Sequence, residues 1–172
     1  MKDTGAIYSP LVAIFRTRSI HGHELYPMAK YICQLHQGDH PGGPPSTPLP
    51  VVSVISIAAI RNPPVTTDNP PKYARKEDRE LTKSKLRLAL RMAAYNGHRR
   101  VVLGALGCGA FHNPSHEVAK LYKEVFSEEE FTGGWWQEIA FAVLDTAKPE
   151  DRGVNGQGNF GVFYRELDGL IV

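Results

Sequence analysis

Four apolar stretches predict the strands of a sheet. The stretch 51–60 (VVSVISIAAI) is almost continuous and rich in β-branched residues, which is typical of a strand buried on both faces. Residues 101–106 (VVLGAL) and 139–144 (IAFAVL) have the same character. The stretch 7–15 (IYSPLVAIF) carries a proline near its start, which a strand tolerates at an edge or a bulge.

Helical patterns alternate with these strands. Between residues 77 and 96, apolar positions alternate with Lys and Arg as in an amphipathic helix, and Gly97 is typical of the position just past a helix end. A second helix is expected to begin after Asn113, a good N-cap, with Pro114 at its first position, and to run to about Phe126.

The remaining segments are less regular. Residues 26–37 fit either a short helix or a loop. Proline and glycine make 40–50 (HPGGPPSTPLP) a surface loop, and four prolines do the same for 61–71. Residues 159–164 are expected to form a last short element.

The order strand, helix, strand, helix, strand favours an α/β fold, in which right-handed crossovers place helices over a mostly parallel or mixed central sheet. With 172 residues, the chain is expected to form one domain over 1–172, with 40–50 as an excursion from it.

Composition narrows the class of protein. The chain is 42% hydrophobic and 22% charged, as in ordinary globular proteins, and a net charge of +2 gives no reason to expect a nucleic-acid partner. No apolar run is long enough for a membrane span. Two cysteines, Cys33 and Cys108, without metal-ligand spacing favour an intracellular compartment, and neither a metal nor a cofactor is expected.

The segment 101–114 (VVLGALGCGAFHNP) carries the clearest chemistry. A buried strand leads through a glycine-rich turn to the start of a helix, where free backbone N–H groups and the helix dipole favour an anion. Glycine allows close approach of the backbone to a phosphate or pyrophosphate. A third glycine for a dinucleotide fingerprint and the Gly-Lys-Ser/Thr of a P-loop are both missing.

This segment resembles the microbial-type poly(ADP-ribose) glycohydrolase family of macrodomains. The match runs from Leu103 through Gly-Cys-Gly-Ala-Phe to Asn113-Pro114 and Glu117-Val118-Ala119, and continues in the strands around Ile7 to Arg16, 54–59 and 141–145 and in Asn159-Phe160. The resemblance implies a three-layer α/β/α macrodomain-like fold, with ADP-ribose or an ADP-ribosylated protein as the partner.

The resemblance also implies roles for individual residues. Gly109 and Ala110 would offer N–H groups to the pyrophosphate, Phe111 would face the distal ribose, and Gly107 would permit the turn. Cys108 would be a small packing residue of the loop, although its place near His112 leaves a thiol nucleophile as an alternative. Three more ligand-contact candidates lie near the C-terminus. They are Asn159, Phe160 and Phe163, the two phenylalanines as adenine platforms, with core packing as the alternative for both.

The family's catalytic Gly-Gly-Gly and Gln-Glu-Glu segment has no counterpart before residue 7. Glycosidic cleavage usually needs two placed carboxylates, so we expect no catalytic residue and a domain that binds ADP-ribose without hydrolysing it. Residues 133–138 (GGWWQE) fit a turn whose tryptophans pack locally. The alternatives are an active hydrolase that uses Asp145 or Glu138, and a protein-interaction module that binds no ligand.

Overall fold

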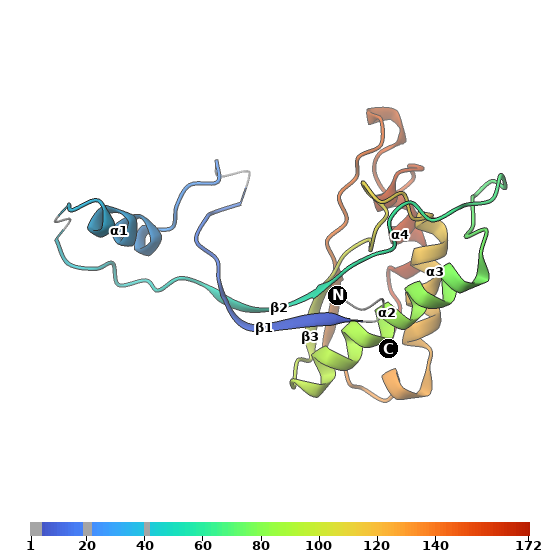
Figure 1. The fold of residues 1–172 in the computed structure, drawn as a ribbon, viewed down its shortest axis with the longest axis horizontal. Coiled ribbons are helices and arrows are strands. Elements are labelled where there is room, and N and C mark those ends of the chain that lie inside the picture. The colour runs from blue at the N-terminus through green and yellow to red at the C-terminus, as the bar shows by residue number, and fades with distance from the viewer. Residues whose placement is uncertain (1–4, 19–21, 40–41) are drawn as a thin grey trace. The chain divides into compact units, whose positions relative to one another are not determined.

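The computed structural model describes residues 5–18, 22–39 and 42–172 and divides the chain into two compact units (Figure 1). One unit comprises Tyr8–Ser56, and the other comprises Ile57–Val172 with the residues up to Ile7. The single domain over 1–172 stays a prediction.

In the unit Tyr8–Ser56, β1 (Ala6–Ala13) pairs with β2 (Val51–Ile57) in a two-stranded antiparallel sheet. Ser53 on β2 ties the strands together, because it accepts a hydrogen bond from the Tyr8 hydroxyl (3.2 Å) and donates one to the Pro10 carbonyl (3.0 Å). The undecided segment 26–37 is helical, forming α1 (Pro27–His36).

The prediction that the 51–60 stretch is buried on both faces is wrong for β2. Val51 is 54% exposed and Val52 is 42% exposed. The strand is shorter than the apolar stretch, and its partner in the sheet is β1. The apolar run therefore predicted the strand correctly but not what covers it.

The larger unit is built on a parallel β-α-β connection. Strand β3 (Arg100–Leu103) pairs in parallel with β4 (Glu138–Phe141), with Val101 opposite Ile139, and α3 (Ser115–Phe126) lies between them in sequence. This confirms the parallel pairing expected of the central strands, although each sheet has two strands. The unit also contains two further α-helices and two short 3-10 helices: α2 (Lys76–Tyr95), α4 (Asn159–Leu167), η2 (Glu129–Phe131) and η3 (Pro149–Asp151).

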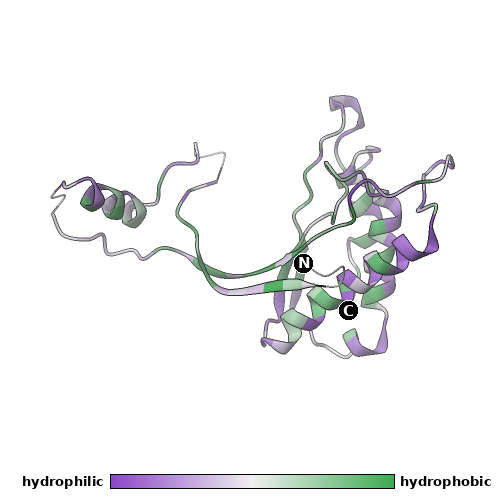
Figure 2. Cartoon of the chain, in the orientation of Figure 1, coloured by the Kyte–Doolittle hydropathy of each residue, from purple (hydrophilic) through white to green (hydrophobic). Residues whose placement is uncertain are grey.

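The core of this unit lies between the helices and one face of the β3–β4 sheet. Figure 2 shows hydrophobic and hydrophilic bands on the helices, as expected for amphipathic elements. The fully buried side chains come from α2, α3 and α4, and an aromatic cluster joins them to β4. These residues are Leu86, Leu90, Val118, Leu121, Val125 and Val162, with Tyr122, Phe126, Phe141 and Phe163 as the aromatic cluster.

The other face of the β3–β4 sheet is open. Val102 in β3 is 74% exposed, and Leu144, just past β4, is 79% exposed. The expected burial of these two strands on both faces is therefore wrong, because the helices of the unit cover one face.

Ion pairs join α2 to α3 and to the segment that follows it. Arg87 makes two hydrogen bonds to the Glu128 carboxylate, at 2.6 and 2.7 Å, and Arg91 binds Glu130 in the same way. Lys83 lies 2.9 Å from Glu124. Lys83, Arg87 and Arg91 of α2 thus form a ladder of ion pairs with acidic partners.

We predict that Glu128→Gln reduces the loss of unfolding free energy that occurs as the pH is lowered. The paired Arg87 guanidinium lowers the pKa of Glu128, so its stabilisation is present above the unfolded pKa of about 4.3 and is lost as pH falls through the folded value. The free energy of unfolding of the variant should be about 1 kcal/mol lower than that of the wild type at neutral pH. Urea unfolding as a function of pH measures this, with the exposed neighbour Glu129→Gln as the control. An acid slope identical to the wild type would contradict it.

Candidate functional site

The glycine-rich loop follows the carboxyl end of β3 and leads into α3. Strand β3 ends at Leu103 and α3 begins at Ser115, so the loop occupies the place where open α/β sheets bind ligands. The sequence predicted a strand over 101–106, and the structure ends the strand earlier and gives those residues to the loop.

The loop folds back on itself through short backbone hydrogen bonds. The N–H of Cys108 donates to Ala105 (3.0 Å), that of His112 to Gly109 (2.9 Å) and that of Asn113 to Gly107 (3.0 Å). Gly107 has φ +75° and His112 has φ +52°, the left-handed region that turns of this tightness require.

The prediction that Asn113 caps α3 is wrong. Pro114 holds the position before the helix, which begins at Ser115, and no side chain caps this end. Asn113 is instead buried, with 5% of its surface exposed. A buried amide needs hydrogen-bond partners, and Asn113 finds them inside the loop.

The Asn113 side chain ties both ends of the loop to the body of the unit. Its Nδ2 lies 2.7 Å from the carbonyl of Ile60, 3.2 Å from that of Gly107 and 3.3 Å from that of Phe111. Its Oδ1 accepts a hydrogen bond of 2.8 Å from the Tyr73 hydroxyl. One side chain therefore sets the conformation of the loop. Sequence reasoning missed Tyr73, because it lies far from the loop in sequence and no local pattern marks it.

Asn159 holds the middle of the loop from α4. Its Nδ2 donates to the carbonyl of Cys108 at 3.2 Å. The structure thus brings Asn159, predicted as a ligand contact, to the loop, where its amide contacts protein.

These contacts decide where the loop N–H groups point. In a trans peptide the C=O and the following N–H point in opposite directions. The carbonyl of Cys108 is held by Asn159, and the carbonyl of Gly109 is held by the N–H of His112, so the N–H groups of Gly109 and Ala110 point away from both contacts. In the part of the chain that the structure describes, neither N–H has an acceptor. The loop offers two adjacent free donors.

Phe111 lies at the exposed end of this loop. Its carbonyl accepts hydrogen bonds from Asn113 and from the N–H of Asn62 (2.9 Å), which fixes its backbone. The residue is 38% exposed. A phenyl ring so placed is accessible to a ligand held by the neighbouring N–H groups.

The two phenylalanines near the C-terminus have different surroundings. Phe163 is 2% exposed and packs against Tyr122 and Phe141, with ring centroids 6.2 and 5.8 Å away. Core packing, the alternative to ligand contact, is therefore its role. Phe160 is half-buried, close to Tyr164 on the same helix, and remains the candidate adenine platform.

Cys108 is not prepared as a nucleophile. Burial raises the pKa of its thiol to about 12, so the thiolate is scarce at neutral pH. This supports its interpretation as a packing residue of the loop.

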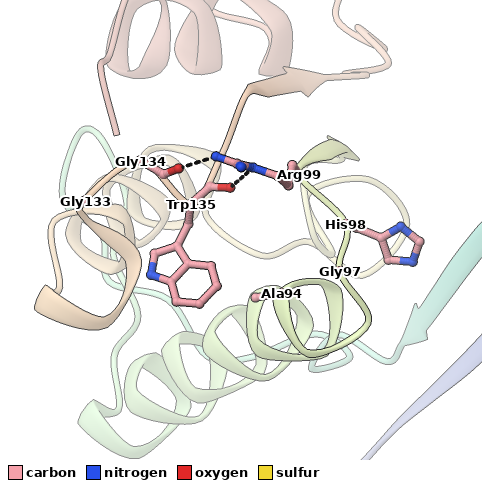
Figure 3. Close-up of a pocket in the computed structure, with 7 residues that line it drawn as sticks. All are labelled: Ala94, Gly97, His98, Arg99, Gly133, Gly134 and Trp135. Atoms are coloured by element: carbon pink, nitrogen blue, oxygen red, sulfur yellow. Dashed lines mark hydrogen bonds between the residues drawn. The ribbon is translucent and has the colours of Figure 1, made fainter.

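The segment 133–138 forms a turn, as predicted. It lies at the end of the β3–β4 sheet opposite to the glycine-rich loop. Arg99 fixes the turn by donating to the carbonyls of Gly134 (2.7 Å) and Trp135 (3.2 Å), as Figure 3 shows. Trp136 is buried, but Trp135 is 53% exposed and lines a hollow of about 320 Å³, so only one tryptophan packs as expected. This hollow lies at the amino ends of β3 and β4, away from the loop.

Asp145 is engaged by its own turn. Its carboxylate accepts hydrogen bonds from the N–H groups of Ala147 (3.4 Å) and Gly153 (3.3 Å), and Gly158 packs directly against it. Among the residues described, no group of three or more His, Cys, Asp or Glu side chains could hold a metal. None of the helices in these same residues has the length and apolar character to cross a membrane.

A β-α-β unit whose glycine-rich loop presents free N–H groups before a helix makes this an α/β protein similar to macrodomains. Comparison with solved structures identifies specific similar proteins. The chain is similar to poly(ADP-ribose) glycohydrolase of Deinococcus radiodurans, which was solved in complex with ADP-ribose. In one crystal form the TM-score is 0.67 at 28% identity over 97% of this chain, and in another it is 0.63 at 26% identity over 96%. The resemblance predicted from the sequence is thereby confirmed.

The same enzyme from Thermomonospora curvata is similar over 94% of this chain, with TM-score 0.62 and 26% identity. The chain spans about half the length of these relatives, 54% and 53% of the two Deinococcus chains and 47% of the Thermomonospora chain. No family model matches the sequence, and no curated protein does.

The two loop glycines should respond differently to the same substitution. A Cβ on Gly107 would collide with the Asn113 amide and lie 2.7 Å from the Ala59 Cβ, at a positive φ, whereas a Cβ on Gly109 meets open space. We predict that Gly107→Ala lowers the free energy of unfolding by about 2 kcal/mol or more and that Gly109→Ala leaves it within about 0.5 kcal/mol. Urea unfolding of the pair measures this. Equal stability of the two variants would refute the placement of Gly107 against Asn113.

Proposed function

We propose that this chain binds ADP-ribose, free or attached to a protein, through the loop Gly107–Phe111. The observation that carries the proposal is the pair of free N–H groups of Gly109 and Ala110, which point outward because their companion carbonyls are held. The Deinococcus relative was solved in complex with ADP-ribose, and this chain shares its fold.

The pyrophosphate is the part of the ligand that the loop suits best. Gly109 and Ala110 would each donate one hydrogen bond to its oxygens, and Phe111 would pack against the distal ribose. Such donors are fixed in place before the ligand arrives, so binding requires little reorganisation of the loop. Phe160, at the amino end of α4, would contact the adenine.

The full three-layer α/β/α arrangement belongs to the same proposal. The helices of this unit cover one face of the β3–β4 sheet, and the open face with Val102 is where a second helical layer would pack. We also propose an intracellular location, as the sequence favours.

We further propose that this chain binds ADP-ribose without hydrolysing it. The two carboxylates considered as atypical catalysts are poorly placed for that chemistry. Asp145 already accepts two backbone hydrogen bonds. Glu138 begins β4, lies 4.0 Å from Arg100 and is at the opposite end of the parallel strands from the loop.

Titration of ADP-ribose into the purified chain tests the site. We expect a dissociation constant in the micromolar range, about −8 kcal/mol, and weaker binding of AMP and ribose 5-phosphate, which lack the pyrophosphate. Gly109→Glu should abolish binding, because its carboxylate would occupy the pyrophosphate position. Gly109→Ala is the matched control and should bind, since a Cβ there meets open space.

Two outcomes of this titration would count against the proposal. Unchanged affinity in folded Gly109→Glu would refute the assignment of the loop. No heat and no thermal shift with the wild-type chain would favour a protein-interaction module.

The hydrolysis proposal has its own measurement. We expect no ADP-ribose to be released from poly(ADP-ribose) or from a mono-ADP-ribosylated protein above the rate without protein, because Asp145 is held by its own turn and Glu138 lies at the opposite end of the strands from the loop. The Deinococcus enzyme serves as the positive control. Release by the wild type that disappears in Asp145→Asn or Glu138→Gln would reverse this part of the proposal.

A further inference from the structure

A buried chain of polar side chains connects α2 to the loop. The hydroxyl of Thr82 on α2 lies 3.2 Å from the Tyr73 hydroxyl and 2.9 Å from the Asp78 carbonyl, and Tyr73 donates to Oδ1 of Asn113 at 2.8 Å. Thr82, Tyr73 and Asn113 are 2%, 8% and 5% exposed. A polar group buried this deeply lowers the stability of the fold unless it has a hydrogen-bond partner. These three side chains therefore strongly prefer one hydrogen-bonded arrangement.

Tyr73 satisfies the oxygen of the Asn113 amide. The Tyr73 hydroxyl donates to Oδ1 while Nδ2 faces the carbonyls of the loop, and these contacts together fix which way the amide faces. Burial raises the pKa of Tyr73 to about 12, so its hydroxyl stays protonated and able to donate well above neutral pH. A reversed amide would set its oxygen against those carbonyls.

The Asn113 amide holds the loop on both sides of its free donors. Gly107 lies before Gly109 and Ala110, and Phe111 lies after them. A change in the direction of the Asn113 amide would therefore release both ends of the segment that carries the free N–H groups.

We propose that Tyr73 is a positioning residue, which acts through Asn113 to orient the Gly109 and Ala110 N–H groups for an anionic ligand that it does not itself contact. This inference rests on the proposed function of the loop and adds a specific residue outside the glycine-rich motif. Tyr73 is held for this task by its own loop, since it forms an isolated bridge with Val65.

Tyr73→Phe tests the inference, with Tyr122→Phe as the matched control. Tyr122 is also a buried tyrosine, and its hydroxyl donates to the carbonyl of Gly104 (3.0 Å), at the end of β3 rather than within the donor segment. Tyr122→Phe loses this one buried hydrogen bond, and Tyr73→Phe loses the bond to Asn113 together with the contact with Thr82. Only Tyr73→Phe should weaken ADP-ribose binding, by roughly three- to tenfold.

Amide spectra of the ligand-free protein give a readout that a general loss of stability would not move. In Tyr73→Phe the ¹⁵N–¹H resonances of Gly109 and Ala110 should shift, and in Tyr122→Phe they should stay close to the wild type. Thr82→Val, which removes the hydroxyl beside that of Tyr73, should shift the same resonances to a smaller extent.

The outcomes separate this inference from the proposed function. If the wild type binds ADP-ribose and folded Tyr73→Phe binds equally well with unshifted resonances, the positioning role is refuted and the binding site stands. If the wild type does not bind, the proposed function fails, and the spectra alone decide the role of Tyr73. If Tyr73→Phe does not fold, Thr82→Val carries the test, and unshifted resonances in it would refute the inference.

Discussion

The buried amide of Asn113 is the constraint on which the rest of the site depends. Leaving such a group unsatisfied costs about 1–3 kcal/mol, and Asn113 avoids that cost by binding carbonyls at both ends of the loop and at Ile60. The glycine at 107 follows from this arrangement, because the amide fills the space that a Cβ would need. Gly107 is thus required for packing around the Asn113 side chain, whereas the role proposed for Gly109 is to let a ligand approach the backbone.

In the proposed site, the loop would attract an anion through backbone dipoles rather than through charged side chains. Its carbonyls are held by Asn113, Asn159 and the turn itself, which leaves the N–H groups of Gly109 and Ala110 outward. A chain with net charge +2 and no lysine or arginine in the loop can therefore present a suitable site for a pyrophosphate. This also explains why overall composition gave no indication of the ligand.

Local sequence patterns predicted the elements better than their surroundings. The helix at 77–96, the parallel strands and the loop between them follow from periodicity and glycine placement, and the structure confirms them. Asn113 clamps a loop instead of capping a helix, and two of its partners, Ile60 and Tyr73, are distant in sequence, so the local cap preference was misleading. The same limit applies to the apolar strands. An apolar residue such as Val102 is expected to be buried, but the local sequence does not show which element, if any, covers it.

Binding and catalysis make different demands on this chain. Tyr73, Asn113 and Asn159, which hold the loop, all belong to the unit that contains Ile57–Val172. Glycosidic cleavage would additionally need carboxylates brought to the exposed side of the loop, and Asp145 is committed to its own turn. The contacts that fix the loop lie on its buried side, whereas catalytic carboxylates would be needed on its exposed side. The proposed binding of ADP-ribose therefore does not require catalytic groups to be present.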